Sequence, residues 1–369
     1  MVTAKGTTRS AGREVVLPTY IVSIAPGALD RIGEIVRVSA AAHRYAIITD
    51  DNVGPLYATR VSAALRMPAA ATFTLAAGEA HKTRETWARL TDEMLAAGFG
   101  RDTTIIAVGG GVVGDMAGFV AATFMRGVPY VQVPTSLLAM IDASVGGKTG
   151  VDTPAGKNLV GAFHQPAAVV ADTTVLGSLP IEQLRAGIAE AIKHGVIADE
   201  DYFARVESLA GTLHAMDVAS PAVLDLVARS VEIKAAVVER DEREGGVRKT
   251  LNFGHTLGHA VETLSGYTLL HGEAVAIGMA LESQLAERAG VAECGTNDRL
   301  RAALERAGLP TRAPATMRAD DVISVTRHDK KARGGVTEYA LPRRIGAMAG
   351  ERSGWAVPVS DDLVREVLA

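Results

Sequence analysis

The chain has 369 residues, a formal net charge of −4 and a single cysteine, Cys294. This length allows two domains of ordinary size, and the slightly negative charge argues against nucleic acid or an anionic membrane as the main partner. The lone cysteine excludes an internal disulfide, residues 1–14 are polar and basic, and no apolar run reaches membrane-spanning length, so we expect a cytoplasmic protein.

Strands and helices are expected to alternate in the first part of the chain. We predict helices at residues 29–38 and 83–97, and strands at residues 15–24, 45–49, 103–108, 130–134 and 168–172. This alternation predicts an open α/β sheet.

Polar residues near the strand ends are candidates for holding a nucleotide. Asp50 and Asn52 follow the second predicted strand, where a ribose contact is one interpretation and an ordinary turn with Asx bonds is the other. Glu79 and Lys82 lie in a segment that is either a nucleotide loop or a solvated helix start.

A glycine-rich segment follows the strand at residues 103–108. The apolar strand runs into Gly109, Gly110 and Gly111, which indicates a backbone cradle for pyrophosphate at a helix N-terminus. A tight turn is the alternative, because glycine is the default wherever φ is positive. Lys148 and Lys157, each just after glycines, favour a phosphate site because a lysine is a compact charge suited to phosphate.

The composition changes near residue 180, after which almost every long segment has helical periodicity. Pro180 and Pro221 are placed as helix starts and Gly245-Gly246 as a helix stop. We therefore expect an α/β domain at residues 1–176 and a mostly α-helical domain at residues 177–369. We expect the tail at residues 351–369 to form a terminal helix with a polar lead.

The predicted helix at residues 181–197 carries Glu190 and Lys193 on one face. A surface ion pair is the ordinary interpretation of such a pair. The small and apolar neighbours of both residues favour a face that is turned inward.

A metal site is indicated further along the chain. His255 and His259 are spaced i, i+4 on one helix face, and His271 follows. Such a pair alone is often structural. With His271 and the inward carboxylate Glu190, it predicts a divalent metal site, for which zinc is the best candidate and cobalt the second. Lys234, Arg248 and Asn252 in the same region would add a pocket for a small polyanion.

Together these motifs resemble the 3-dehydroquinate synthases, a family of sugar phosphate cyclases. The resemblance covers roughly residues 15–346 and rests on a few segments: residues 109–166, 189–193, 232–234, 248–259 and 271–273. It implies an NAD-binding α/β domain, a helical domain, an active site between them and a homodimer.

The resemblance also implies the reaction. The substrate would be the phosphorylated sugar acid 3-deoxy-D-arabino-heptulosonate 7-phosphate, and the products 3-dehydroquinate and phosphate, in the shikimate pathway of aromatic amino acid biosynthesis. Such a lyase oxidises the substrate transiently with NAD, eliminates phosphate, reduces the ketone and closes the ring by an aldol step, so that NAD is regenerated.

The resemblance assigns roles residue by residue. The metal ligands would be Glu190, His255 and His271, and His259 would relay the proton at C4. NAD contacts would fall at Asp50, Asn52, Glu79, Lys82, Gly110, Gly111, Val112, Gly114, Asp115, Thr135, Ser136, Asp142, Lys148, Lys157, Leu176 and Ser178. Substrate contacts would fall at Asp142, Lys148, Asn158, Lys193, Lys234, Arg248, Asn252, His259 and Lys330 or Lys331, with Lys330 favoured. Arg126 would reach the phosphate pocket of the neighbouring subunit.

Three alternatives stay open. Valiolone or deoxy-inosose synthases are related cyclases, but the valiolone type departs from the pattern that Lys234, Arg248 and Asn252 match here. An alcohol dehydrogenase of the glycerol dehydrogenase type would release NADH and would not need so many cationic anchors. A non-catalytic binding protein would not need an intact ligand set.

Overall fold

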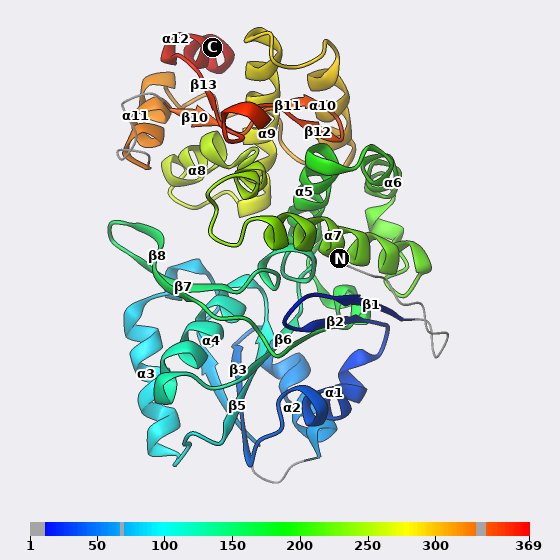
Figure 1. Cartoon of the computed structure of the whole chain (residues 1–369), viewed down its shortest axis with the longest axis vertical. Helices are drawn as coiled ribbons and strands as arrows, with labels where there is room; N and C mark the ends of the chain where they lie inside the picture. The colour runs from blue at the N-terminus through cyan, green and yellow to red at the C-terminus, as the bar shows by residue number, and fades with distance from the viewer. Residues whose placement is uncertain (1–11, 67–69, 330–336) are drawn as a thin grey trace. The chain divides into compact units, whose positions relative to one another are not determined.

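The computed structural model describes residues 12–66, 70–329 and 337–369 (Figure 1). Its contacts divide the chain into two units. The first runs to Leu179 and includes Asp217–Glu232, and the second comprises Pro180–Met216 and Ile233–Ala369. The domain boundary that we expected near residue 176 stays a prediction.

The described part of the first unit contains a seven-stranded sheet in the order β1-β2-β9-β6-β5-β3-β4. All neighbouring strands in it are parallel except β1 and β2. The strands are β1 (Arg13–Val16), β2 (Ile21–Ile24), β3 (Arg44–Asp50), β4 (Ala70–Leu75), β5 (Thr103–Gly109), β6 (Tyr130–Pro134) and β9 (Ala168–Ala171).

Helices cover both faces of this sheet. Figure 1 shows α3 (Arg84–Ala96) and α4 (Gly111–Thr123) on one side and α1 (Ile32–Ser39) and α2 (Gly54–Leu65) on the other. The central strand β5 is buried along its whole length, as its continuous apolar run requires. Its face toward α3 and α4 packs with Leu90, Met116 and Val120 in one apolar core.

The first unit differs from the expected elements in several places. The strand predicted at residues 15–24 is two antiparallel strands, joined by a turn in which the Leu17 amide donates to the Tyr20 carbonyl at 2.9 Å. Pro18 breaks the strand because it lacks an amide proton for the sheet. Helix α2, strand β4 and the hairpin of β7 (Lys148–Thr153) and β8 (Gly156–Phe163) were not predicted.

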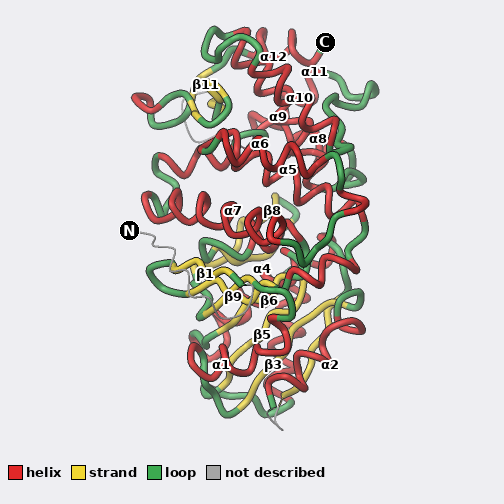
Figure 2. Tube along the Cα trace, turned by 90° about the vertical axis from the view of Figure 1, so that its right-hand side faces the viewer, coloured by secondary structure: helices red, strands yellow, loops and turns green. Residues whose placement is uncertain are grey.

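The second unit is built from helices, drawn red in Figure 2. They are α5 (Ile181–Ala198), α6 (Glu200–Ala210), α8 (His255–Leu264), α9 (His271–Arg288), α10 (Thr296–Arg306), α11 (Ala319–Asp329) and α12 (Asp361–Leu368), with α7 (Pro221–Arg240) divided between the units. Two short strand pairs join them: β10 (Glu338–Tyr339) with β13 (Val357–Pro358), and β11 (Pro342–Arg344) with β12 (Ala347–Met348). The predicted fold class, an α/β part followed by a mostly helical part, is confirmed.

Two helix boundaries in the second part of the chain were wrong. Helix α7 ends at Arg240, before the Gly245-Gly246 pair, because Asp241 starts a loop by accepting hydrogen bonds from the amides of both glycines. The terminal helix is only α12, capped by Ser360, because Pro358 ends a short strand just before it.

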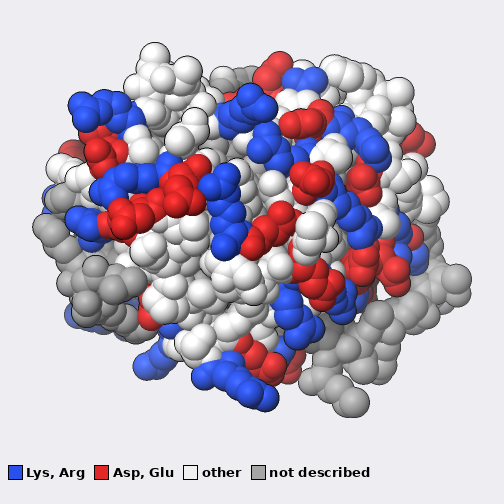
Figure 3. Space-filling model, turned by 90° about the horizontal axis from the view of Figure 1, so that it is seen from above, with Lys and Arg blue, Asp and Glu red and all other residues white. Residues whose placement is uncertain are grey.

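The surface gives two further observations. Among the described residues, no helix is both long enough and apolar enough to span a bilayer. On the face shown in Figure 3, basic and acidic side chains are interspersed, and neither sign gathers into a large patch.

The buried carboxylate of Asp172 gives a prediction for stability. It is 1% exposed and accepts hydrogen bonds from the amides of Gly27 at 2.8 Å, Leu29 at 3.1 Å and Thr174 at 3.0 Å. Asp172→Ala leaves these amides without their acceptor, so we expect the free energy of unfolding in urea to fall by about 3 kcal/mol.

Asp30→Ala is the matched control, because Asp30 and Asp172 both pair with Arg60, at 2.7 and 3.8 Å, but the Asp30 side chain is 63% exposed. Its loss should cost at most about 0.5 kcal/mol. Equal losses for the two variants would contradict this account of the buried carboxylate.

Candidate active site

Helix α5 buries an acid and a base on its inner face. Glu190 is 0% exposed and Lys193 is 1% exposed, and the two form an ion pair. The inward face that the neighbouring residues favoured is therefore present, and the interpretation as a surface pair was wrong. A buried carboxylate is stabilised by opposite charge beside it, and a bound cation would add to the charge of Lys193, which makes Glu190 a candidate for a metal ligand.

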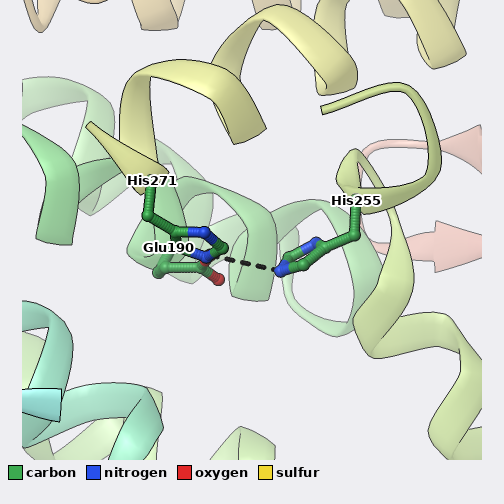
Figure 4. Close-up of side chains that lie close together, drawn as sticks. All are labelled: Glu190, His255 and His271. Atoms are coloured by element: carbon green, nitrogen blue, oxygen red, sulfur yellow. Dashed lines mark ion pairs between the residues drawn. The ribbon is translucent and has the colours of Figure 1, made fainter. Parts of the chain in front are cut away.

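Two histidines meet this carboxylate from two other helices (Figure 4). His255 is the first residue of α8 and His271 the first of α9, and their Nε2 atoms lie 3.6 and 3.5 Å from Glu190 Oε1. Donor atoms of the three side chains all lie within 4.8 Å of one another. Two imidazoles and a carboxylate at this spacing fit zinc or cobalt.

Glycines allow the three helices to approach closely enough. A Cβ atom on Gly272, the residue after His271, would lie 2.3 Å from the Cα of Ala186 in α5. One on Gly278 of α9 would lie 1.9 Å from the Gly254 carbonyl oxygen before α8. The positions of the ligands therefore depend on direct backbone packing between helices.

A second partner lies beside each histidine ring. His255 Nδ1 lies 3.1 Å from the Phe253 carbonyl oxygen, so the tautomer that donates to this carbonyl leaves Nε2 toward Glu190. His271 Nδ1 lies 3.9 Å from Glu262 Oε1. Our sequence reasoning missed Glu262, although its spacing of three residues from His259 puts it on the same helix face.

These surroundings move the two histidine pKa values in opposite directions. Burial, helped by the charge of Lys193, holds the pKa of His255 well below its ordinary value, which favours the neutral form that binds metal. Burial alone would also lower the pKa of His271, but Glu190 and Glu262 outweigh it and raise that pKa to about 9.

A second group of ligand atoms overlaps the first. His259, Glu262 and His271 also bring donor atoms within 4.8 Å of one another. The ring centroids of His255 and His259 are 5.1 Å apart, so the predicted proton relay lies beside the ligand set. Both groups share His271, so they form one centre with two overlapping sets of candidate ligands.

The other predicted substrate residues of this unit vary in exposure. Lys234 is 8% exposed and Arg248 is 3% exposed, and the Arg248 guanidinium donates to the Glu242 carbonyl. The exposed Asn252 donates to Glu244 Oε1 at 2.7 Å. The roles of these three residues toward a substrate stay predictions, and Lys330 and Lys331 lie outside the described residues.

Asp241 organises the loop that carries Arg248. Its carboxylate accepts hydrogen bonds from the amides of Gly245 at 2.9 Å, Gly246 at 2.7 Å and Arg248 at 3.0 Å. Partial burial alone would raise the pKa of Asp241, but these amides hold it below its ordinary value. The sequence offered no spacing signal for this role.

In the first unit, the predicted NAD residues follow neighbouring strand ends. Asp50 ends β3, the glycines follow β5 with Gly110 as the N-cap of α4, and Thr135 follows β6. In the sheet register, Thr49 pairs with Val108 and Val108 with Val133, so these ends lie side by side. Gly111, Val112, Gly114 and Asp115 form the first part of α4, and Ser136 Oγ accepts from the Ala139 amide.

Asp50 makes the Asx turn that was one of its two interpretations. Its Oδ1 accepts from the amides of Asn52 at 3.0 Å and Val53 at 2.8 Å. This turn does not exclude a nucleotide at the end of β3, and the ribose contact stays a prediction. Leu176 and Ser178 lie in a 3₁₀ segment after β9, where the Ser178 hydroxyl is 2.6 Å from that of Tyr57.

Lys82 forms a buried polar cluster instead of a solvated helix start. It is 3% exposed, and its Nζ lies 2.6 Å from both Asp115 Oδ2 and Asn158 Oδ1. Burial alone would lower the pKa of Lys82, but Asp115 and Glu79 outweigh it and raise that pKa. Glu79 lies 3.7 Å from Lys82 Nζ and 3.8 Å from Lys157 Nζ. The cluster around Lys82 therefore contains the predicted NAD residues Glu79, Asp115 and Lys157 and the predicted substrate residue Asn158.

Three further residues of this unit were predicted to contact NAD, the substrate or the neighbouring subunit. Asp142 belongs to the helical turn Ala139–Ala143, and the exposed Lys148 begins β7. Arg126 is exposed at the end of the short helix that follows α4. The contacts predicted for these three side chains stay predictions.

Two family profiles match consecutive parts of the chain, which together run from residue 72 to residue 332. The profile described as 3-dehydroquinate synthase N-terminal matches residues 72–186, and the one described as 3-dehydroquinate synthase C-terminal matches residues 187–332. A 3-dehydroquinate synthase of Symbiobacterium thermophilum is 48% identical over 332 residues, which cover 89% of this chain and 92% of that one.

Two solved structures of cyclases are similar throughout. A 2-deoxy-scyllo-inosose synthase complexed with carbaglucose-6-phosphate, NAD+ and Co2+ has a TM-score of 0.87 at 26% identity, covering 99% of both chains. A 2-epi-5-epi-valiolone synthase of Streptomyces hygroscopicus with NAD+ and Zn2+ bound has a TM-score of 0.84 at 28% identity, covering 100% of this chain and 98% of that one.

His271 gives a prediction for pH dependence. In the metal-free protein its imidazole should titrate at about pH 9. Because this pKa is raised above the unfolded value of about 6.5, its stabilising contribution is fully present below about pH 6.5 and is lost as the pH rises through about 9. Long-range ¹H–¹⁵N NMR of the metal-free protein measures this midpoint.

Glu262→Gln provides the internal comparison, because it removes one of the two carboxylates that raise this pKa. Its midpoint should lie below that of the parent protein. A parent midpoint at or below the ordinary histidine value would show that the carboxylates do not act on His271 in this way.

Proposed function

The chain belongs to the 3-dehydroquinate synthase family, and we propose that it is a phosphate-eliminating lyase of the shikimate pathway. Its substrate is 3-deoxy-D-arabino-heptulosonate 7-phosphate and its products are 3-dehydroquinate and phosphate. The convergence of Glu190, His255 and His271 within 4.8 Å carries this proposal, because it gives the family motif a working ligand set. Identity of 48% to a 3-dehydroquinate synthase, against 26% and 28% to two other cyclases, favours this substrate over theirs.

The cofactors are NAD and a divalent metal, zinc or cobalt. Glu190, His255 and His271 would hold the metal, and the strand ends with the start of α4 would hold NAD. When bound, NAD accepts and returns the hydride at C4, and the metal stabilises negative charge on substrate oxygens.

The residues of the second unit would hold and orient the substrate. Lys193 is buried beside Glu190 and supplies positive charge where water cannot screen it. Arg248 is fixed through its own amide by Asp241 and through its guanidinium by the Glu242 carbonyl, so it can receive an anionic group with little rearrangement. His259, beside His255, would move the proton at the C4 hydroxyl.

We also propose a cytoplasmic homodimer in which Arg126 serves the partner's site. Met125 and Arg126 have φ angles of 53° and 70°, which are costly for residues with a side chain, and Gly127 follows with a φ of 118° that glycine tolerates. Hydrogen bonds from the Gly127 amide to Phe124 and from the Val128 amide to Ala121 hold this corner. This strained corner presents the exposed Arg126 at a fixed point, as a contribution to a partner would require.

A coupled assay with catalytic NAD+ and added zinc or cobalt tests the reaction. It follows phosphate release and net NADH together. Stoichiometric phosphate and dehydroquinate without net NADH are expected, because the hydride returns within each turnover. Net NADH without phosphate would mean a dehydrogenase, and turnover only with sedoheptulose 7-phosphate or glucose 6-phosphate would mean another cyclase.

His271→Ala should lower the turnover by at least about 100-fold and abolish tight zinc binding, because it removes a metal ligand. The exposed His214 contacts Arg185 at 3.4 Å, so His214→Ala is the control histidine of the same unit and should keep both properties. Zinc content after gel filtration and the phosphate assay measure the two effects. Full zinc occupancy in His271→Ala would rule out this ligand assignment.

Mixing two inactive variants tests the role of Arg126 across the dimer. Arg126→Ala and His271→Ala should each be inactive as pure dimers. Their co-refolded mixture should regain about a quarter of the parent activity, because each mixed dimer has one site with both residues intact. A mixture as inactive as its components would show that Arg126 does not act on the partner's site.

A further inference from the structure

We propose that Glu282, a buried residue of α9, is a positioning residue of the metal centre that holds the first turn of α8 and thereby the ligand His255. The proposal rests on the metal site proposed above. It concerns a residue that no motif of the sequence singled out.

Glu282 makes direct hydrogen bonds to the start of α8. It is 0% exposed, and its Oε2 accepts from the Gly254 amide at 2.7 Å while its Oε1 accepts from the Leu257 amide at 3.0 Å. The first amides of a helix lack partners within the helix and need an acceptor from outside. A carboxylate also suits the positive end of the helix dipole.

Helix α8 cannot supply this cap from its own sequence. Its N-cap is Gly254, which has no side chain to accept a hydrogen bond and has a φ of 78°. A Cβ atom at this position would lie 2.4 Å from Met279 Cγ and 2.9 Å from the Val275 carbonyl oxygen, both in α9. The close packing that requires glycine therefore excludes the usual Ser, Thr, Asp or Asn cap.

The cap encloses the metal ligand. His255 lies between Gly254 and Leu257, the two residues whose amides Glu282 binds, and its Nδ1 faces the carbonyl of Phe253, the residue before Gly254. Helix α9 thus carries the ligand His271 at its first residue and fixes the backbone of a second ligand about three turns later.

Glu282→Gln is the sharpest substitution. Glutamine has the same shape and keeps one oxygen acceptor, but its amide group cannot accept from the second backbone amide. One N–H at the start of α8 then loses its partner, and the Nε2 atom of His255 loses its fixed position. Changes in groups that orient a metal ligand typically weaken metal affinity by about 10- to 100-fold.

Glu287→Gln is the matched control. Glu287 lies on the same helix, and its carboxylate accepts from the Asn297 amide at 2.9 Å in the first turn of α10. Both carboxylates accept from backbone amides at the start of a helix, Glu282 from two amides and Glu287 from one, but α10 carries none of the three proposed ligands. A merely structural capping role would move both variants alike.

The test measures zinc affinity by competition with a chromophoric chelator and the visible spectrum of the cobalt-substituted protein, both without substrate. Glu282→Gln should raise the zinc Kd by about 10- to 100-fold and alter the cobalt bands, and Glu287→Gln should leave both unchanged. Parent-like affinity and spectrum in Glu282→Gln would overturn the proposal. Should this variant fail to fold, Glu282→Asp, which keeps the charge but withdraws it by one methylene, is read by the same two measurements.

The same measurements separate this inference from the proposal it rests on. A parent protein that binds zinc weakly or not at all would overturn the metal centre itself. Tight parent binding with an unaffected Glu282→Gln would overturn only the role of Glu282.

Discussion

The burial of the Glu190 carboxylate is the constraint on which the rest of the site depends. A charge at 0% exposure is unfavourable unless opposite charge lies beside it, and Lys193 supplies one such charge. Two imidazoles complete the surroundings, and their Nε2 atoms lie 3.5 and 3.6 Å from the carboxylate. This arrangement suits a divalent cation better than it suits an empty protein interior.

Close backbone packing between helices positions the three proposed ligands. Gly272 sets the start of α9 against α5, and Gly254 with Gly278 set α8 against α9, so each ligand begins or lies on a helix held at close range. Two further carboxylates support this geometry: Glu262 lies 3.9 Å from the ring of His271, and Glu282 accepts from the Gly254 amide at the start of α8. The first unit uses a different principle, in which the ends of adjacent parallel strands bring together side chains from distant parts of the sequence.

The sequence predicted what is local and periodic. The spacing of His255 and His259, the inward face of Glu190 and the strand that runs into Gly109 all depend on near neighbours, and each lies where it was expected. The long strand at residues 15–24 was wrong because a single proline outweighed its β propensity. Lys82 is buried because Asp115, 33 residues away, faces it, which no local pattern shows.

The residues that support the ligands were the least predictable part. Glu282 lies 28 residues from Gly254, and its function follows only from the contact of two helices. An acidic residue in a helix looks the same in sequence whether it faces solvent or caps a neighbour. Asp241 and Glu262 were missed for the same reason: their roles depend on the backbone amides and the ring atom that lie close to them in the folded structure.

Anomalous diffraction at the zinc edge, from crystals of the protein with NAD+ and zinc, tests the central claim most directly. The account predicts one strong peak about 2.0–2.2 Å from Glu190, His255 Nε2 and His271 Nε2. A peak bound instead by His259, Glu262 and His271, whose donor atoms also lie within 4.8 Å of one another, would contradict it.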